Sequence, residues 1–436
     1  MDFFNPGTCF HFGRQLFSGK KGKETITGGV FEMDIKKLAF RNLLRNKRRT
    51  LLTALSLFVS GFVIVTLHGY LRGALDASKE MIIKLDTGHV LITTKEYFER
   101  RIFLPQEEYI QDLDEVQKIL DNSKYVDFYA LRIKAGSMIF TKNGATKPAY
   151  IFAIDPQKEK KTFDLSRKIV EGENDLTKGG VLAIDLARSL RVKPGDTIII
   201  LSRSVYGGLS AIKIPISGIA TIGYAAFDRS LVILSFENAR KLLKMADGAH
   251  EILVFLKKEG DINKFIRSLK LPENLVAKSY TFVLGGFAFF YKFADIFYMA
   301  IYILITLLAA FAIVNTMTVA VFERMREIGT LKALGMTDNE IFLLFGLEGT
   351  IIGTAGGLAG GLAGLFTNAI LHIKGMNFES MIKGIEFPFP YVIRPSVNPW
   401  ILLIAFVIVT SMSFLASTLP ALQAKKLLPQ EALRTL

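Results

Sequence analysis

Four long apolar segments constrain this chain more than any other feature of its sequence. They cover residues 51–71, 296–321, 341–371 and 400–419. Each is long enough for an α-helix to cross the hydrocarbon core of a bilayer, which takes about 20 apolar residues. Because charged residues still make up 22% of the 436 residues, part of the chain must lie outside lipid. The sequence therefore predicts an α-helical membrane protein with four transmembrane helices and a large additional domain.

Basic residues beside the predicted spans indicate how the chain is oriented. Cytoplasmic flanks of membrane helices are rich in Lys and Arg. Segment 33–50 is a basic amphipathic stretch, and further basic residues follow the second and fourth spans. Four crossings return the chain to its starting side, so both termini, including 420–436, are predicted to be cytoplasmic. These clusters, rather than nucleic-acid binding, account for the net charge of +14.

The same count of membrane crossings places residues 72–290 and the loop 372–399 outside the cytoplasm. Segment 72–290, inserted between the first two spans, is predicted to be an α+β domain. Strand-like runs at 88–94, 197–202, 212–219 and 231–235 alternate with helical patterns at 107–120 and 236–245. The single cysteine, Cys9, excludes an intrachain disulfide. A hydrophobic core must therefore hold this domain together.

The first 32 residues lack the apolar core of a signal peptide. A more orderly sequence begins at Met33. The segment 1–32 is therefore interpreted either as a disordered leader or as a mis-assigned extension that precedes the true start, and the sequence does not choose between Met1 and Met33.

Motifs for catalysis and metal binding are missing from the sequence. It contains no G-x-x-x-x-G-K-[ST] phosphate loop, no H-E-x-x-H zinc motif and no G-x-S-x-G nucleophile elbow. We expect no catalytic residues, no metal site and no cofactor in this chain.

Small and polar residues inside the predicted spans have both a structural and a functional interpretation. Two series of glycines repeat every four residues in 341–371 and suit close helix packing or a mobile helix contact: Gly353, Gly357, Gly361 and Gly356, Gly360, Gly364. Glu348 lies in the same span, where an unpaired carboxylate is costly, so it is either hydrogen-bonded near the membrane surface or functional. His68 is interpreted as an interfacial polar residue rather than a proton relay.

The predicted cytoplasmic loop 322–340 has a helical pattern. Glu323 would lie next to Arg326 and Glu327 on one helix. Taken alone, this pattern predicts an amphipathic turn on the membrane surface.

This loop also carries the strongest resemblance to a known family. Asn315-Thr316-Met317, 321–329 and 332–337 resemble the signature of FtsX-like ABC transporter permeases, the MacB and Lol type. The resemblance extends to Glu348-Gly349, to the ending 420–434, and to 180–196 and 218–228 in the outer domain, which resemble the MacB-like periplasmic core.

The resemblance implies a non-catalytic dimer subunit that transmits motion from a separate ATPase to the outer domain. ATP and Mg²⁺ would be bound by that ATPase, present in two copies, and the second permease would be identical or paralogous. Coupling to the ATPase is expected at Glu323, Arg324, Glu327, Gly329, Lys332 and Gly335, with Glu348 as a further coupling residue. The family further implies a bacterial inner membrane with the outer domain in the periplasm.

Residues 68–74 and 88–90 are similar to the lipoprotein-releasing, LolC/LolE-like permeases. This similarity implies extraction of lipoproteins from the outer leaflet, with a substrate cavity expected at His68, Tyr70, Phe289, Phe290 and Phe293. An interfacial aromatic belt is the structural alternative for these aromatic residues. Two other functions stay open: MacB-like export of a peptide or amphiphile with a periplasmic carrier or adaptor, and signalling to a periplasmic hydrolase.

Overall fold

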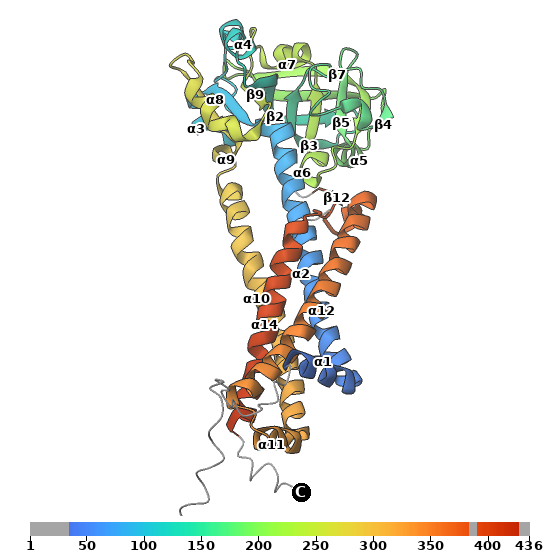
Figure 1. The fold of residues 1–436 in the computed structure, drawn as a ribbon. Helices are drawn as coiled ribbons and strands as arrows, with labels where there is room; N and C mark the ends of the chain where they lie inside the picture. The colour runs from blue at the N-terminus through green and yellow to red at the C-terminus, as the bar shows by residue number, and fades with distance from the viewer. Residues whose placement is uncertain (1–34, 383–389, 427–436) are drawn as a thin grey trace, which may run out of the picture.

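The computed structural model describes residues 35–382 and 390–426. An α+β domain sits at one end of a bundle of long helices, and short helices lie across the other end (Figure 1). The predicted leader 1–32 and the last residues of the predicted C-terminal segment, 427–436, lie outside the described residues.

Four helices in the described part of the chain are long and apolar enough to cross a membrane. They are α2 (Lys47–Ile82), α10 (Gly286–Glu323), α12 (Asp338–Lys374) and α14 (Pro399–Lys426). Each predicted span lies within one of them, and each helix is longer than the span. The charged residues Arg72, Asp76 and Lys79 end the apolar stretch of α2, yet the helix continues because it enters the outer domain.

The glycines of α12 allow this helix to pack tightly on two neighbours. A Cβ atom at Gly356 would lie 2.8 Å from the carbonyl oxygen of Ala54 in α2, and one at Gly360 would overlap the carbonyl oxygen of Phe58. The other glycine series faces α14, where a Cβ at Gly353 would lie 2.6 Å from that of Ser413. Both series therefore form helix contacts inside the chain, as small residues do in membrane bundles.

The outer domain, between α2 and α10, contains ten strands, and shorter elements lie outside this domain. The strands are β1 (Val90–Thr94), β2 (Val126–Thr141), β3 (Thr146–Ala153), β4 (Ile169–Gly172), β5 (Gly180–Ala183), β6 (Thr197–Arg203), β7 (Leu209–Ala220), β8 (Leu231–Leu234), β9 (Glu251–Leu256) and β10 (Leu275–Ser279). The helices are α3 (Lys95–Glu99), α4 (Leu113–Asp121), α5 (Ile184–Leu190), α6 (Ala225–Asp228), α7 (Phe236–Leu243), α8 (Ile262–Ser268) and α9 (Tyr280–Val283). Outside this domain lie α1 (Ile35–Arg45), α11 (Met325–Ala333), α13 (Glu379–Ile382), β11 (Met376–Asn377) and β12 (Val392–Ile393).

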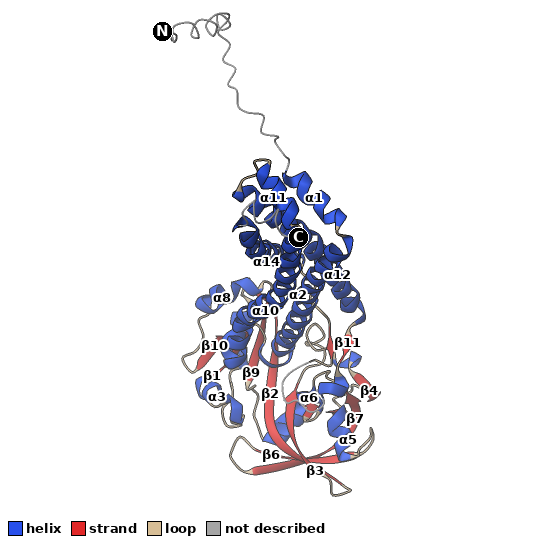
Figure 2. Cartoon of the chain, turned by 90° about the horizontal axis from the view of Figure 1, so that it is seen from below, coloured by secondary structure: helices blue, strands red, loops and turns tan. Residues whose placement is uncertain are grey.

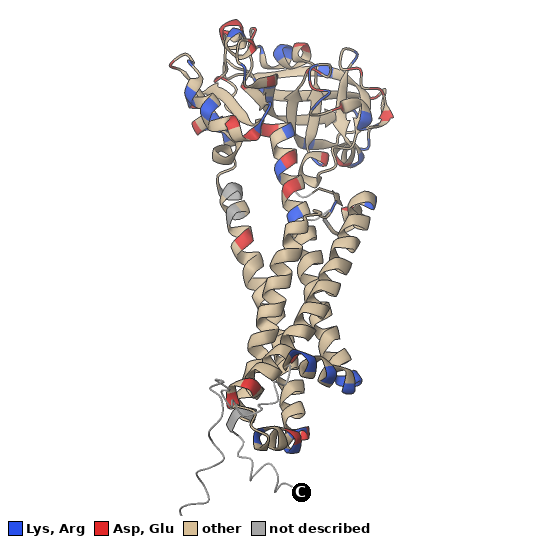
Figure 3. Ribbon diagram, in the orientation of Figure 1, with Lys and Arg blue, Asp and Glu red and all other residues tan. Residues whose placement is uncertain are grey.

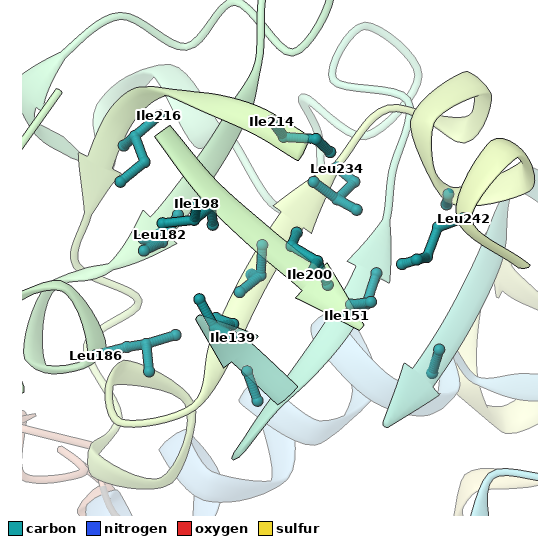
Figure 4. Packing of buried hydrophobic residues seen from close by; sticks show 14 of the residues in the cluster. Ile139, Ile151, Leu182, Leu186, Ile198, Ile200, Ile214, Ile216, Leu234 and Leu242 are labelled. Carbon is teal, nitrogen blue, oxygen red and sulfur yellow. The ribbon is translucent and has the colours of Figure 1, made fainter. Parts of the chain in front are cut away.

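Six of the strands close into a barrel in the order β2-β3-β8-β5-β7-β6 and back to β2. Its interior is filled by aliphatic side chains, among them Ile139, Ile151, Ile198 and Ile200 (Figure 4). The first half of β2 leaves the barrel and pairs with β9, which extends the sheet through β1 to β10. Closing the barrel leaves no open edge on its six strands.

The two helices that connect the bundle to the outer domain are attached differently. The end of α2 and the π-helical turn after it, Ile83–Thr87, insert Met81, Ile82 and Leu85 into a buried cluster that also contains Phe152 and Ile233 of the barrel strands. By contrast, α10 follows α9 through Gly285, whose φ of +47° is a conformation that favours glycine. The end of α2 is thus anchored in the barrel core, whereas α10 begins after a glycine turn.

One helix of the outer domain is shorter than the sequence pattern predicts. The pattern covers 107–120, but α4 begins at Leu113. Residues before it form a turn, and Ile110 makes an isolated bridge with Ala249. This part of the prediction is wrong because backbone pairing with a distant segment replaces the first helical turn.

Candidate coupling and substrate sites

At the base of the bundle, α10 ends in an elbow at Arg324. Its φ of −106° and ψ of 13° interrupt the helix, and α11 starts at Met325. Gly335, with φ of +99°, turns the chain after α11. Thr337 then caps α12 through a reciprocal pair of hydrogen bonds with Glu340. The predicted loop 322–340 is thus a short helix between two fixed turns.

The elbow is held by a buried ion pair. Arg324 donates to Oε1 of Glu348 in α12 at 3.1 Å, and the side chains are 6% and 0% exposed. Asn42 of α1 donates to the same carboxylate oxygen at 2.7 Å, and its carbonyl accepts from Arg324 at 3.2 Å. This three-residue cluster, Asn42-Arg324-Glu348, joins α1, the elbow and α12.

Two exposed ion pairs add to this connection. Arg45 of α1 donates to Glu327 of α11 at 2.6 Å, and both side chains are about half exposed. Arg49 of α2 lies 3.5 Å from Glu323 at the end of α10. Because exposed pairs contribute only about 0–1 kcal/mol, the buried cluster is the stronger link. In two views, α1 and α11 lie next to each other at the base of the bundle (Figures 1 and 2).

The residues expected to contact an ATPase do not all face outward. Arg324 is buried against Glu348, Gly329 is buried, and Lys332 pairs with Asp338 at 3.0 Å. Glu323 and Glu327 do not share a helix, because the elbow separates α10 from α11. The sequence-based picture of one helix that presents Arg324 is therefore wrong, since the buried carboxylate of Glu348 attracts that guanidinium inward.

The outward surface of this turn includes residues that the sequence did not single out. Leu334 is 79% exposed. It is accompanied by the exposed residues Arg326, Thr330, Ala333 and Gly335. An exposed leucine at the tip of a short helix suits insertion into a groove of another protein. Of the residues expected at this contact, Gly335 has this position most clearly.

A cavity of about 310 Å³ opens at the outer end of the bundle between α2, α10 and α14. His68 lines it, and its Nδ1 is 2.7 Å from the hydroxyl of Tyr302. Arg72 pairs with Asp295 at 3.2 Å across the same cavity. Other lining residues are Tyr298, Met299, Asn398, Trp400, Ile401 and Ile404. The cavity combines an apolar wall with a few polar groups, which suits an amphiphile.

Of the four expected cavity residues whose side chains the structure describes, only His68 lines this cavity. Tyr70 packs on Phe378 instead, with ring centroids 5.5 Å apart. Phe289 and Phe293 stack at 4.2 Å on the exposed surface of α10, and the side chain of Phe290 is outside the described ones. The sequence analysis did not identify Tyr302 as the partner of His68 or the ion pair between Arg72 and Asp295. Charged residues at the end of an apolar span would have been a usable signal for that ion pair.

One wall of the barrel is apolar and uncovered. On β2, Met138 and Phe140 point away from the barrel interior, and their partners across β6 are Leu201 and Ile199. The exposed residues Tyr150, Leu209 and Tyr206 extend this apolar wall. The segments 136–153 and 197–220 that build it contain four cations and no carboxylate: Lys142, Lys147, Arg203 and Lys213. Contiguous apolar surface with a polar rim marks protein contacts.

No group of three or more His, Cys, Asp or Glu residues that could hold a metal ion occurs within residues 35–382 and 390–426.

Comparisons with known proteins match both the C-terminal part of the chain and most of its length. Residues 299–429 match the family model of the FtsX-like permease C-terminal region. The chain is 26% identical over 310 residues to the lipoprotein-releasing system transmembrane protein LolC of Xylella fastidiosa, covering 66% of this chain and 73% of LolC. It is also 26% identical over 431 residues to an uncharacterized ABC transporter permease of Methanocaldococcus jannaschii, covering 92% and 98% of the two chains.

Two solved structures each cover a little under half of this chain. One is the periplasmic region of MacB from Actinobacillus actinomycetemcomitans, with a TM-score of 0.31, 15% identity, and coverage of 45% of this chain and 91% of that one. The other is the extracellular domain of the ABC-type transporter YknZ from Gram-positive bacteria, with a TM-score of 0.31, 11% identity, and coverage of 44% and 99%. Residues 299–429 thus match the FtsX-like permease C-terminal region, and over most of its length the chain is similar to ABC transporter permeases.

Proposed function

We propose that this permease couples ATP hydrolysis by a separate ATPase to the release of a lipoprotein from the outer leaflet of the membrane. ATP and Mg²⁺ would be bound by the ATPase, and a second permease, identical or paralogous, would complete the transporter. The similarity to LolC supports the choice of substrate. The cavity lined by His68, Arg72 and Tyr302 offers a polar and an apolar side for such an amphiphile.

The continuity of α2 is the observation that carries this proposal. This helix has 36 residues, or about 54 Å at 1.5 Å per residue. Its lower end is tied to the elbow cluster through α1, and its upper end is buried in the outer domain. Movement imposed at the base would therefore reach the outer domain without passing through a flexible joint.

The proposal places α1, α11 and both termini in the cytoplasm and the outer domain on the opposite side of a bacterial inner membrane. The distribution of charge supports this orientation. Lys and Arg gather along α1 at the base, and the middle of the bundle is nearly free of charged residues (Figure 3). This is the pattern that the positive-inside rule describes.

Leu334→Asp should weaken association with the ATPase by more than tenfold. Burying a leucine side chain contributes about 2 kcal/mol, and a buried aspartate without a partner costs more. The measurement is the amount of ATPase that copurifies with the permease, together with substrate-stimulated ATP hydrolysis. Ile102→Asp, at an isoleucine of the outer domain that is 93% exposed, is the matched control. Normal copurification and stimulation by the Leu334 variant would contradict contact at this tip.

The apolar wall of the barrel supports a second contact, with a soluble carrier or adaptor on the outer side. We infer a partner with an apolar centre and an acidic rim. A second copy of this chain is disfavoured there, because Lys142, Lys147, Arg203 and Lys213 of one copy would face the same cations of the other.

A photo-crosslinking amino acid in place of Ile199 tests this contact in cells. We expect a crosslink to one acidic extracytoplasmic protein, because that residue lies at the centre of the wall. Exchanging the four wall cations for glutamine should reduce the crosslink several-fold, and the probe at Ile102 should not give it. A product with twice the mass of the permease would show instead that two copies meet at this wall.

Two other functions use the same architecture. Export of a peptide or amphiphile from the periplasm through an adaptor would need the wall but not a lipoprotein substrate. Signalling to a periplasmic hydrolase would need α2 but not the cavity. Stimulation of ATP hydrolysis by purified acylated lipoprotein, and not by its unacylated form, distinguishes lipoprotein release from both.

A further inference from the structure

The short helix α1 has an outward apolar side that no described part of the bundle covers. Ala39 and Leu43 are buried, and they lie on the side of α1 that packs against α12. One helical turn apart on another side, Phe40 and Leu44 are exposed at 56% and 54%. A helix with two such apolar sides contacts the protein with one and needs an apolar environment for the other.

The exposed apolar side of α1 continues onto α2. Leu51, Leu52 and Leu55, in the first turns of α2, are exposed as well. They belong to a candidate membrane span, so lipid is their natural environment. Continuity with this lipid-facing surface favours the bilayer, and not another protein, as the occupant beside Phe40 and Leu44. A helix arranged in this way lies in the plane of the membrane surface.

Cations without a partner border this apolar side. Arg41, one position beyond Phe40, is exposed, and so are Lys47 and Arg48 at the start of α2. None of these three pairs with a carboxylate in the part of the chain that the structure describes, whereas the neighbouring Arg45 and Arg49 do. The three cations therefore lie at the depth of the lipid headgroups with their charge available. Anionic headgroups are the ligands that match them.

We propose that α1 and the start of α2 form a binding site for anionic phospholipid headgroups of the cytoplasmic leaflet, and that its occupancy controls the position of the coupling helix α11. Arg41, Lys47 and Arg48 bind the headgroups, while Phe40 and Leu44 enter the acyl region. Arg45 and the Asn42-Arg324-Glu348 cluster connect α1 to α11 and to the elbow. Anionic lipid would thereby adjust how the transporter responds to its ATPase. The inference rests on the orientation given above.

Fluorescence quenching by brominated lipid tests the site on the full chain without an ATPase. Cys9 is replaced by serine, Leu44→Cys carries the fluorophore, and the protein is placed in vesicles of phosphatidylcholine and phosphatidylglycerol. At equal lipid composition, brominated phosphatidylglycerol should quench more than brominated phosphatidylcholine. Each cation at the membrane surface should contribute up to about fivefold preference for the anionic lipid. This preference should be abolished in the triple variant Arg41→Gln, Lys47→Gln and Arg48→Gln.

A matched control removes the same charge from the outer domain. Lys142→Gln with Lys147→Gln and Lys213→Gln should keep the preference for phosphatidylglycerol. Equal quenching by the two lipids in the parent protein would overturn the headgroup site, and the absence of quenching by either would show that α1 is not in the membrane. Both results are independent of what the transporter carries, so they are distinguishable from failure of the proposed function.

A second measurement tests the control of coupling. In vesicles that hold the permease with its ATPase, adding phosphatidylglycerol should raise substrate-stimulated hydrolysis for the parent protein and for the outer-domain control. The triple variant of α1 and α2 should lose this increase. An unchanged response of that variant would remove the regulatory role from the lipid site.

Discussion

Gly360→Leu is expected to prevent the bundle from packing. A Cβ atom at this position would overlap the carbonyl oxygen of Phe58 in α2, and backbone atoms of a continuous helix cannot turn aside. The two helices would have to separate along the whole series of glycines, because Gly356 and Gly364 approach Ala54 and Phe62 in the same way. Destabilisation by more than about 4 kcal/mol is characteristic of such overpacking.

Thermal unfolding of the purified permease in detergent measures the effect. The midpoint should fall by at least about 10 °C, or the protein should fail to accumulate. Ala359→Leu is the control, because Ala359 is the neighbouring residue and is exposed on α12. If Gly360→Leu unfolded at the same temperature as the parent protein, the close contact between α12 and α2 would be wrong.

Removing one member of the Arg324–Glu348 pair is expected to have the second largest effect. Arg324→Met leaves the fully buried carboxylate of Glu348 without its cation, which typically costs about 3–5 kcal/mol. The hydrogen bond from Asn42 remains, but it does not neutralise the charge. Glu348→Met should destabilise similarly, because it leaves a guanidinium buried at the elbow.

The double variant Arg324→Met with Glu348→Met distinguishes the cost of an unpaired buried charge from the role of the pair in positioning α1 and the elbow. Replacing both partners by apolar side chains of similar length should restore most of the stability lost in either single variant. Substrate-stimulated ATP hydrolysis should stay low, because the methionines no longer hold α1 and the elbow together through Asn42. Full recovery of stimulated hydrolysis in the double variant would show that the pair only stabilises the fold.

Local sequence patterns predicted the elements of the bundle better than their ends. The apolar spans were readable because hydrocarbon requires about 20 apolar residues whatever the rest of the chain does. Hydropathy did not reveal that α2 continues to Ile82, because Arg72, Asp76 and Lys79 lie beyond the apolar stretch. Packing of the end of α2 in the outer domain, a contact with distant strands, keeps that part helical.

Local sequence patterns also could not identify the uncovered wall of the barrel. The alternation at Phe140 and Ile139 is hidden in the sequence because both residues are apolar, so the strand resembles one that is buried on both sides. Which side is covered depends on closure of the ring by β6 on β2, some sixty positions along the chain. Only the tertiary structure could show that Phe140 is on the uncovered wall.

The sequence by itself determined the resemblance to ABC transporter permeases, the four candidate spans and the loop at which contact with an ATPase is expected, since each depends on residues close together in the chain. The tertiary structure decided what those residues do. The sequence predicted that Glu348 is either hydrogen-bonded or functional and that Arg324 contacts an ATPase. It did not show that folding brings the two side chains to 3.1 Å, with Asn42 beside them, 282 positions from Arg324. No local sequence pattern shows which distant residues come into contact. The free energy of burying a charge depends on the partner that the fold supplies.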